Sequence, residues 1–317
     1  MRTILLILAG LFLFAATDAV AEQPYAGKKI LYINSYHLGY GGSDPITQGV
    51  EKVLGETGVE LKIIYMDTKR NSGEEFSQQA ALQAKAVIEE FQPDVVIASD
   101  DNASKYLIMP YYKDAELPFV FCGVNWDASV YGFPYKNVTG MIEVALVSEI
   151  RRHLDNYAKG KRIGFIAADT LSERKNLNYY VERFNIDFEK IYLTKTFAEW
   201  KEKFLSLQDE VDMIMMTTSA GIPDWDDEAA KNFVEENIRI PVGVEHLWEM
   251  PLALIGVTKD YEEMGIWSAH AALKILDGVS PDRIPIAANK NGYLWFNKRI
   301  AAKLGIDEVP PLAQIVD

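Results

Sequence analysis

The sequence predicts an α/β protein with two doubly wound lobes, each built on a mostly parallel sheet of its own. Short, almost continuous apolar runs alternate with amphipathic helical patterns, as expected for strands that helices cover on both faces. Four such runs precede Asn137 and four follow it. A chain of 317 residues is also longer than one core usually supports, which favours two lobes.

The first residues predict an export signal that is not part of the fold. Arg2 gives a positively charged start, and the apolar run from Ile4 to Ala16 is too short to cross a bilayer comfortably. Ala19-Val20-Ala21 has the small-x-small pattern of a signal-peptidase site, and no cysteine follows the run to carry a lipid anchor. We therefore expect residues 1–21 to be a signal peptide, cleaved after Ala21, and a protein in the periplasm. An uncleaved membrane anchor is the alternative.

The apolar runs give the strands in order. They lie at 30–33, 61–66, 95–98, 119–121, 163–167, 191–193, 213–216 and 241–244. Between them, apolar residues at helical spacing predict a helix that reaches Phe91 and ends before Pro93, and another from Leu146 to Tyr157 that ends at Gly160. This alternation predicts βαβ units with parallel pairing.

The loops that follow the strands are the expected binding region, because ligands of open parallel sheets bind beyond the carboxyl ends of the strands. These loops are rich in polar and aromatic residues. The candidate ligand-binding residues are Tyr36, Asp67, Ser99, Asp101, Ser104, Asn125, Trp126, Thr170, Ser172, Thr218 and Trp248. Helix capping is the alternative reading for each Asp, Asn, Ser and Thr. It does not explain the aromatic residues.

These residue types favour a small zwitterion or a planar polar molecule. The ligand would stack on Trp126, with Tyr36 and Trp248 as further walls. Asp101 or Asp67 would hold an ammonium group, and Ser99, Ser104, Thr170 and Ser172 would hold a carboxylate near helix N-termini. Two alternatives stay open: Trp126 packs inside the protein, or Asp101 caps a helix.

Composition and motifs exclude several other functions. The net charge of −14 argues against nucleic acid and anionic membrane surfaces as partners. The single cysteine, Cys122, allows no intramolecular disulfide. The chain has no Gly-x-Ser-x-Gly motif, no histidine spacing typical of metal ligands, and no Gly-x-Gly-x-x-Gly motif near Gly39. We expect no enzymatic activity, no cofactor and no metal.

Several motifs resemble a known family. They are Ile33-Asn34-Ser35-Tyr36-His37, Ser99 to Ser104, Gly123 to Asp127, Asn137-Val138-Thr139-Gly140 and the closing stretch Leu294 to Ile306. Together they resemble the ABC-transporter substrate-binding protein family, which has the type I periplasmic binding protein fold and whose better-known members take up aromatic amino acids. Typical members have Asp-Pro after the fourth strand. Asn125-Trp126-Asp127-Ala128 stands there instead and is closer to a subgroup associated with extracytoplasmic sensing.

The resemblance implies two Rossmann-like lobes joined by three crossovers, at 137–140, 254–258 and 283–286. It also implies that a helix over 261–277 returns the chain to the first lobe after the second crossover. Lobe 1 would contain 27–138 and 255–284, and lobe 2 would contain 139–254 and 285–317. It also implies a monomeric solute-binding protein that clamps a small polar molecule, such as an amino acid, and delivers it to an ABC permease. The alternative is a sensor whose closed form engages a membrane receptor kinase or a cyclic-nucleotide signalling enzyme.

Overall fold

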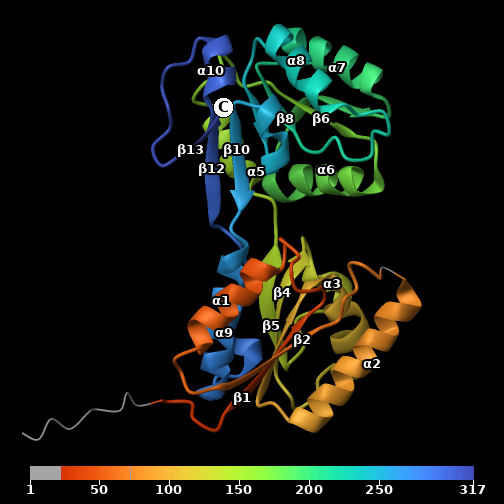
Figure 1. Ribbon diagram of the computed structural model, residues 1–317, viewed down its shortest axis with the longest axis vertical. Helices are drawn as coiled ribbons and strands as arrows, with labels where there is room; N and C mark the ends of the chain where they lie inside the picture. Colours follow the sequence, from red (N-terminus) through yellow and green to blue (C-terminus); the bar gives the residue numbers. More distant parts are fainter. Residues whose placement is uncertain (1–22, 72) are drawn as a thin grey trace, which may run out of the picture.

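The computed structural model describes residues 23–71 and 73–317. These residues form two lobes that lie one beyond the other along the long axis of the molecule (Figure 1). Each lobe has its own sheet, so the predicted α/β fold with two Rossmann-like lobes is confirmed. The predicted signal peptide, residues 1–21, lies outside the described residues.

The lower lobe in Figure 1, here lobe 1, contains a six-stranded sheet with the order β11-β5-β4-β3-β1-β2 and parallel pairing throughout. Its strands are β1 (Lys29–Asn34), β2 (Glu60–Tyr65), β3 (Val95–Ser99), β4 (Phe119–Asn125), β5 (Val138–Glu143) and β11 (Ala287–Ala288). Its helices are α1 (Asp44–Leu54), α2 (Glu74–Phe91), α3 (Asp100–Ala103), α4 (Met109–Tyr111) and α9 (Tyr261–Leu276). Short helical turns are Ser104–Ile108, Ala128–Tyr131 and Pro281–Arg283.

Helices cover both faces of this sheet. Alternate residues of β1 belong to two different apolar clusters: Leu31 packs with α2 on one face, and Ile30 packs with α1 and α9 on the other. Helices α1 and α9 come very close, since a Cβ atom on Gly49 would lie 2.5 Å from the carbonyl oxygen of Glu262. The returning helix predicted at 261–277 is thus found as α9, and it completes lobe 1.

The upper lobe, here lobe 2, contains a seven-stranded sheet with the order β13-β12-β10-β9-β8-β6-β7. Only the β10–β12 pair is antiparallel among the described strands. The strands are β6 (Ile163–Ala168), β7 (Phe188–Thr194), β8 (Met213–Met216), β9 (Val242–Val244), β10 (Ile255–Lys259), β12 (Gly292–Asn297) and β13 (Gln314–Val316). The helices are α5 (Val147–Leu154), α6 (Leu171–Phe184), α7 (Phe197–Glu210), α8 (Asp227–Asn237) and α10 (Lys298–Leu304), with a 3-10 turn at Leu247–Leu252.

The chain crosses between the lobes at three places, each somewhat later than the sequence suggested. Segment 137–140 is part of β5, which pairs with β4 in lobe 1, so the first crossing follows Glu143. Segment 254–258 overlaps β10, which pairs with β9 in lobe 2, so the second crossing follows Lys259. The third crossing follows β11, at 289–291. Strand pairing therefore places the lobe boundaries near 143, 259 and 288 instead of 138, 254 and 284.

The crossing segments are packed and hydrogen-bonded to one another. Asn289, which is buried, accepts from the Val144 backbone N–H at 2.7 Å and donates to the Val144 carbonyl at 3.1 Å. At Gly292 a Cβ atom would lie 2.5 Å from the carbonyl oxygen of Thr258 and would also collide with the Leu146 side chain. The three crossings thus form one hinge region. The absence of a side chain at Gly292 allows Thr258 and Leu146 to pack closely there.

Candidate functional site

The carboxyl ends of the two sheets face each other across the boundary between the lobes. Glu143 is the last residue of β5 in lobe 1 and Lys259 is the last residue of β10 in lobe 2. Their side chains form a largely buried ion pair. Loops from both sheets therefore meet in one region, as expected for the ligand site of a doubly wound fold.

A pocket of about 380 Å³ lies between the lobes in this region. Lobe 1 contributes Asp101, Asn125, Trp126 and Tyr131, and helix α6 of lobe 2 contributes Ser172, Lys175 and Asn176. Its volume is in the usual range for small-molecule sites. Both lobes form its walls, so a ligand here would touch both.

The lobe 1 wall carries a fixed carboxylate. Asp101 Oδ2 accepts from Asn125 Nδ2 at 2.7 Å, and Asp101 Oδ1 accepts from the Tyr131 hydroxyl at 2.7 Å. Asp101 stays partly exposed at the pocket. These two hydrogen bonds orient the carboxylate. Because an ionised carboxylate can accept about four hydrogen bonds, it can still accept from a ligand cation.

The opposite wall is positively polarised. Ser172 lies in the first turn of α6, where unpaired backbone N–H groups and the helix dipole favour negative charge, and Lys175 in the next turn adds a positive side chain. Thr170 caps this helix, since its hydroxyl accepts from the Glu173 backbone N–H at 3.2 Å. The pocket therefore has a negative side in lobe 1 and a positive side in lobe 2.

Trp126 joins the two lobes directly. Its ring lies flat on Tyr179 of α6, with ring centroids 5.0 Å apart and an interplanar angle of 9°. Its indole N–H donates to Asn176 Oδ1 at 3.1 Å, and its carbonyl accepts from Arg183 at 3.0 Å. Only 6% of the residue is exposed. A ligand was expected to stack on the Trp126 ring, but Tyr179 occupies one face of it. Trp126 thus packs between the lobes and also lines the pocket.

The backbone is strained where the loops leave the lobe 1 sheet. Asp67 after β2, Asp100 after β3, and Trp126 after β4 all have positive φ angles, of 55°, 73° and 64°. Gly123 within β4 also has a positive φ, next to a register shift between β4 and β5. Non-glycine residues in this conformation are uncommon and concentrate at functional sites.

Asp100 is the most unusual of these residues. It is buried, and its Oδ2 atom has no hydrogen-bond partner among the described residues. Burial, followed by the nearby charges of Glu143 and Asp101, raises the pKa of Asp100 well above its ordinary value. Its neighbour Asp101 lines the pocket, whereas no side-chain capping bond from Asp100 is found at α3.

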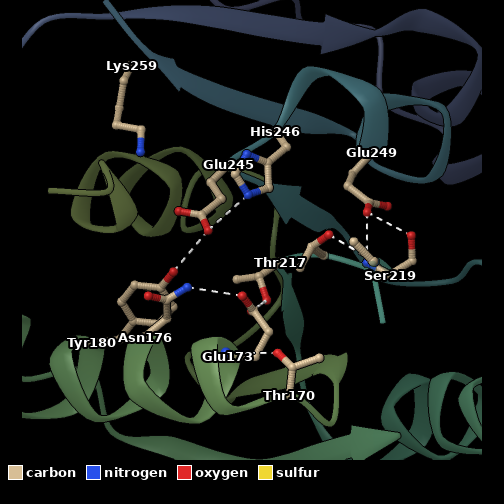
Figure 2. A network of polar contacts seen from close by, with 12 residues as sticks. Thr170, Glu173, Asn176, Tyr180, Thr217, Ser219, Glu245, His246, Glu249 and Lys259 are labelled. Carbon is tan, nitrogen blue, oxygen red and sulfur yellow. Dashed lines mark hydrogen bonds and ion pairs between the residues drawn. The ribbon is translucent and has the colours of Figure 1, made fainter. Parts of the chain in front are cut away.

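Lobe 2 carries a buried polar network behind its pocket wall, shown in Figure 2. Glu173 accepts from Thr217 and, at 3.0 Å, from Asn176, while the Tyr180 hydroxyl donates to Glu245 at 3.0 Å. Burial raises the pKa values of Glu173 and Glu245. The network ties α6 to the loops after β8 and β9, so it holds Asn176 in position at the pocket.

The structure brings four of the predicted residues together at the pocket, namely Asp101, Asn125, Trp126 and Ser172. Other lobe 1 candidates have different surroundings. Tyr36 packs edge-on against Tyr40, with Lys69 5.1 Å from the centre of the Tyr36 ring. Asp67 is paired with Arg70 at 2.7 Å. Ser99 and Ser104 are fully buried, and Ser99 Oγ accepts from the Tyr32 hydroxyl.

The remaining lobe 2 candidates have local roles or lie at the surface. Thr170 is the cap of α6, as the alternative reading held. Thr218 accepts from the Ala220 backbone N–H at 3.0 Å within its own loop. Trp248 is 64% exposed and stacks on His246, with ring centroids 4.2 Å apart. None of these three lines the described pocket.

Three pocket residues were not predicted: Tyr131, Lys175 and Asn176. For the last two, a signal existed in the sequence. Lys175 and Asn176 follow Ser172 by three and four positions, and a helix places such residues on one face. Tyr131 lies in a short turn after β4, and its spacing gives no comparable signal.

Two α/β lobes, three crossings and a pocket between the lobes define a type I periplasmic binding protein. The sequence also matches the family model for ABC transporter substrate binding proteins over residues 38–310. The chain therefore belongs to the ABC transporter substrate-binding protein family. The resemblance stated from the motifs is confirmed. No curated protein matches the sequence significantly.

Solved structures show the same fold at low sequence identity. A ligand-free, open substrate-binding protein with adhesive properties from Clostridium difficile is 19% identical, with a TM-score of 0.70, covering 91% of this chain and 99% of that one. A Streptococcus pneumoniae protein in complex with L-Trp is 16% identical, with a TM-score of 0.52, covering 90% and 100%. A periplasmic ribose ABC transporter protein from Conexibacter woesei is 15% identical, with a TM-score of 0.56, covering 88% and 96%.

Proposed function

We propose that this protein is exported to the periplasm, binds a small zwitterion such as an amino acid between its lobes, and delivers it to the permease of an ABC transporter. The observation that carries the ligand class is the charge arrangement of the inter-lobe pocket, with Asp101 on one wall and Lys175 on the other. The proposed role is binding, without catalysis.

The two walls match the two ends of an amino acid. An ammonium group would bind Asp101, whose carboxylate Asn125 and Tyr131 already orient. A carboxylate would bind the Lys175 ammonium and the Ser172 hydroxyl at the N-terminal end of α6. The rings of Trp126 and Tyr131 at the same pocket favour a ligand with an apolar or aromatic side chain.

Ligand binding would draw the lobes together. Since the two charged walls belong to different lobes, a zwitterion gains both interactions only when the lobes approach each other. The crossings at 144–146, 260 and 289–291 are the segments that would bend. We expect a hinge motion of two rigid lobes, and a permease would recognise the closed form.

A thermal-shift screen of amino acids tests the ligand class. A ligand at a hundredfold excess over its Kd should stabilise the protein by about 2.7 kcal/mol. For the ligand so found, Asp101→Asn should weaken binding more than a hundredfold, because it leaves a buried ammonium unpaired, at a cost of about 3–5 kcal/mol. The melting temperature of the free variant should change little.

Asp67→Asn is the matched control. Asp67 is paired with Arg70 outside the pocket, so this variant should bind the ligand with unchanged affinity. Unaltered affinity of Asp101→Asn with lowered stability would assign Asp101 a structural role and refute the proposed site. For the partner, we expect genes for a permease and an ATPase beside this gene. A neighbouring membrane receptor gene would instead indicate sensing.

A further inference from the structure

A second pocket, of about 480 Å³, lies at the hinge and shares no residue with the inter-lobe pocket. Two of the three crossings border it, since Leu146 ends the first and Lys290 belongs to the third, and Val257 lies in β10, the strand before the second crossing. Leu294 of β12 and Leu312 of the C-terminal segment add to its apolar lining. We call it the hinge pocket.

The walls of the hinge pocket are mainly apolar. Leu146 and Val257 are buried side chains, and Leu294 is partly buried. Leu312 at this pocket is 98% exposed, and its backbone has a positive φ of 66°. A bulky apolar residue held in this conformation and left in water is unfavourable on both counts. A ligand body seated in the pocket would cover this side chain.

The charged groups of the pocket leave one positive charge without a partner. Arg152 donates through Nε and Nη2 to Glu149 Oε2, at 2.9 and 2.6 Å, so these two charges offset each other. Arg152 Nη2 also lies 3.1 Å from His153 Nε2. Because a guanidinium group can only donate, His153 Nε2 accepts this hydrogen bond, which requires a neutral imidazole. The Lys290 ammonium has no carboxylate partner within 23–71 and 73–317.

We propose that the hinge pocket is a second ligand site, which takes a small organic anion with an apolar or aromatic body. The apolar walls would hold the body, and Lys290 would pair with the carboxylate or sulfonate. The volume is ample for such a molecule. This site would be distinct from the zwitterion pocket, because different residues form it.

The experiment uses 8-anilinonaphthalene-1-sulfonate, an aromatic anion whose emission rises in apolar surroundings, titrated into the mature protein. Lys290→Glu should weaken its binding roughly tenfold at low salt, because attraction becomes repulsion. Lys175→Glu is the matched control, since it makes the same charge change at an exposed lysine of the other pocket. It should leave the affinity for the probe unchanged.

Hydrogen exchange locates the bound probe. We expect slower exchange at 290–294 and 311–314, with 172–176 unaffected. A loss of affinity in Lys175→Glu but not in Lys290→Glu, or protection confined to 172–176, would place the probe in the inter-lobe pocket and overturn the proposal. Equal binding to the parent protein and to both variants would also overturn it, because that result indicates an adventitious additive only.

Discussion

Lys259 Nζ lies 2.6 Å from Glu143 Oε1, and this ion pair links the last residue of a strand in one lobe to the last residue of a strand in the other. Both side chains are at least 85% buried, with exposed fractions of 15% and 10%. Burial lowers the pKa of Lys259, but Glu143 and other anionic neighbours outweigh this effect and raise the pKa above its ordinary value. Lys259 therefore stays charged at neutral pH, and its contact with Glu143 fixes the two sheets at the hinge.

Glu143→Gln should destabilise the protein by about 3–5 kcal/mol, because it leaves the buried ammonium of Lys259 without its partner. The double variant Glu143→Gln with Lys259→Met should recover most of this loss, since it removes both charges. Urea unfolding measures both effects. Asp209→Asn, which removes one partner of an exposed pair with Arg239, is the control and should cost less than about 1 kcal/mol. Equal midpoints for Glu143→Gln and the parent would contradict the prediction.

Asp100→Asn should stabilise the protein at neutral pH by about 1–2 kcal/mol, because asparagine does not titrate, whereas the raised pKa of Asp100 couples folding to the uptake of a proton that costs free energy above about pH 4. Asparagine also tolerates the positive φ at this position. In the parent protein the folded state keeps a proton on Asp100 that the unfolded chain releases above about pH 4.

This linkage gives the sign of the pH dependence. Because the folded state binds the extra proton, the contribution of Asp100 to the unfolding free energy falls as pH rises from about 4 toward the raised pKa. The gain from Asp100→Asn should therefore grow with pH over this interval. Unfolding curves between pH 4 and pH 8 measure it, with the exposed Asp209→Asn as the control. A constant difference across this range would count against the prediction.

Trp126→Ala and Tyr179→Ala should have similar effects on the arrangement of the lobes, because each removes half of one stacked pair. We expect a larger radius of gyration by small-angle scattering in both variants. Trp248→Ala serves as the control, since that side chain is 64% exposed and stacks within its own lobe. An unchanged radius for both test variants would show that the stack does not hold the lobes together.

Gly292→Ala should cost about 1–3 kcal/mol, because the added methyl group meets the carbonyl oxygen of Thr258 and the side chain of Leu146 inside the hinge. Gly41→Ala adds the same group at a position with no atom within 4 Å and should be nearly neutral. Thermal unfolding compares the two. Equal melting temperatures would mean that the crossings have more room than their packing indicates.

The exported protein should begin at Glu22, because Ala19 and Ala21 provide the small residues that signal peptidase requires. Intact-mass measurement of protein from the periplasm checks this. A mass that still includes residues 1–21 would indicate a membrane anchor in place of a cleaved signal.

Most of the fold could be predicted because buried parallel strands have a strong sequence pattern. Runs such as 30–33 and 95–98 lie within β1 and β3. The crossings were harder to place, because strands β5 and β10 continue up to the lobe boundary. The first residues of these two strands, starting at Val138 and Ile255, were therefore predicted to be crossovers. Only strand pairing shows which sheet such a segment joins.

The candidate site was predicted in part, for a related reason. The position of Asp101 after a strand was enough to place it at the carboxyl edge of the sheet. Ser99 and Thr218 share that position, but their side chains bond within their own lobe. Whether a loop side chain faces inward or toward the other lobe depends on backbone angles, such as the positive φ of Trp126, that its neighbours in sequence do not specify.

The contact between Trp126 and Tyr179 also gives the protein an internal optical signal. Indole emission depends on the polarity around the ring and on the hydrogen bond at its nitrogen, and here both come from the opposite lobe. Any rotation of the lobes would change this environment. Opening and closing could therefore be followed by intrinsic fluorescence, as the part of the emission that Trp126→Phe removes, in real time and without an attached dye.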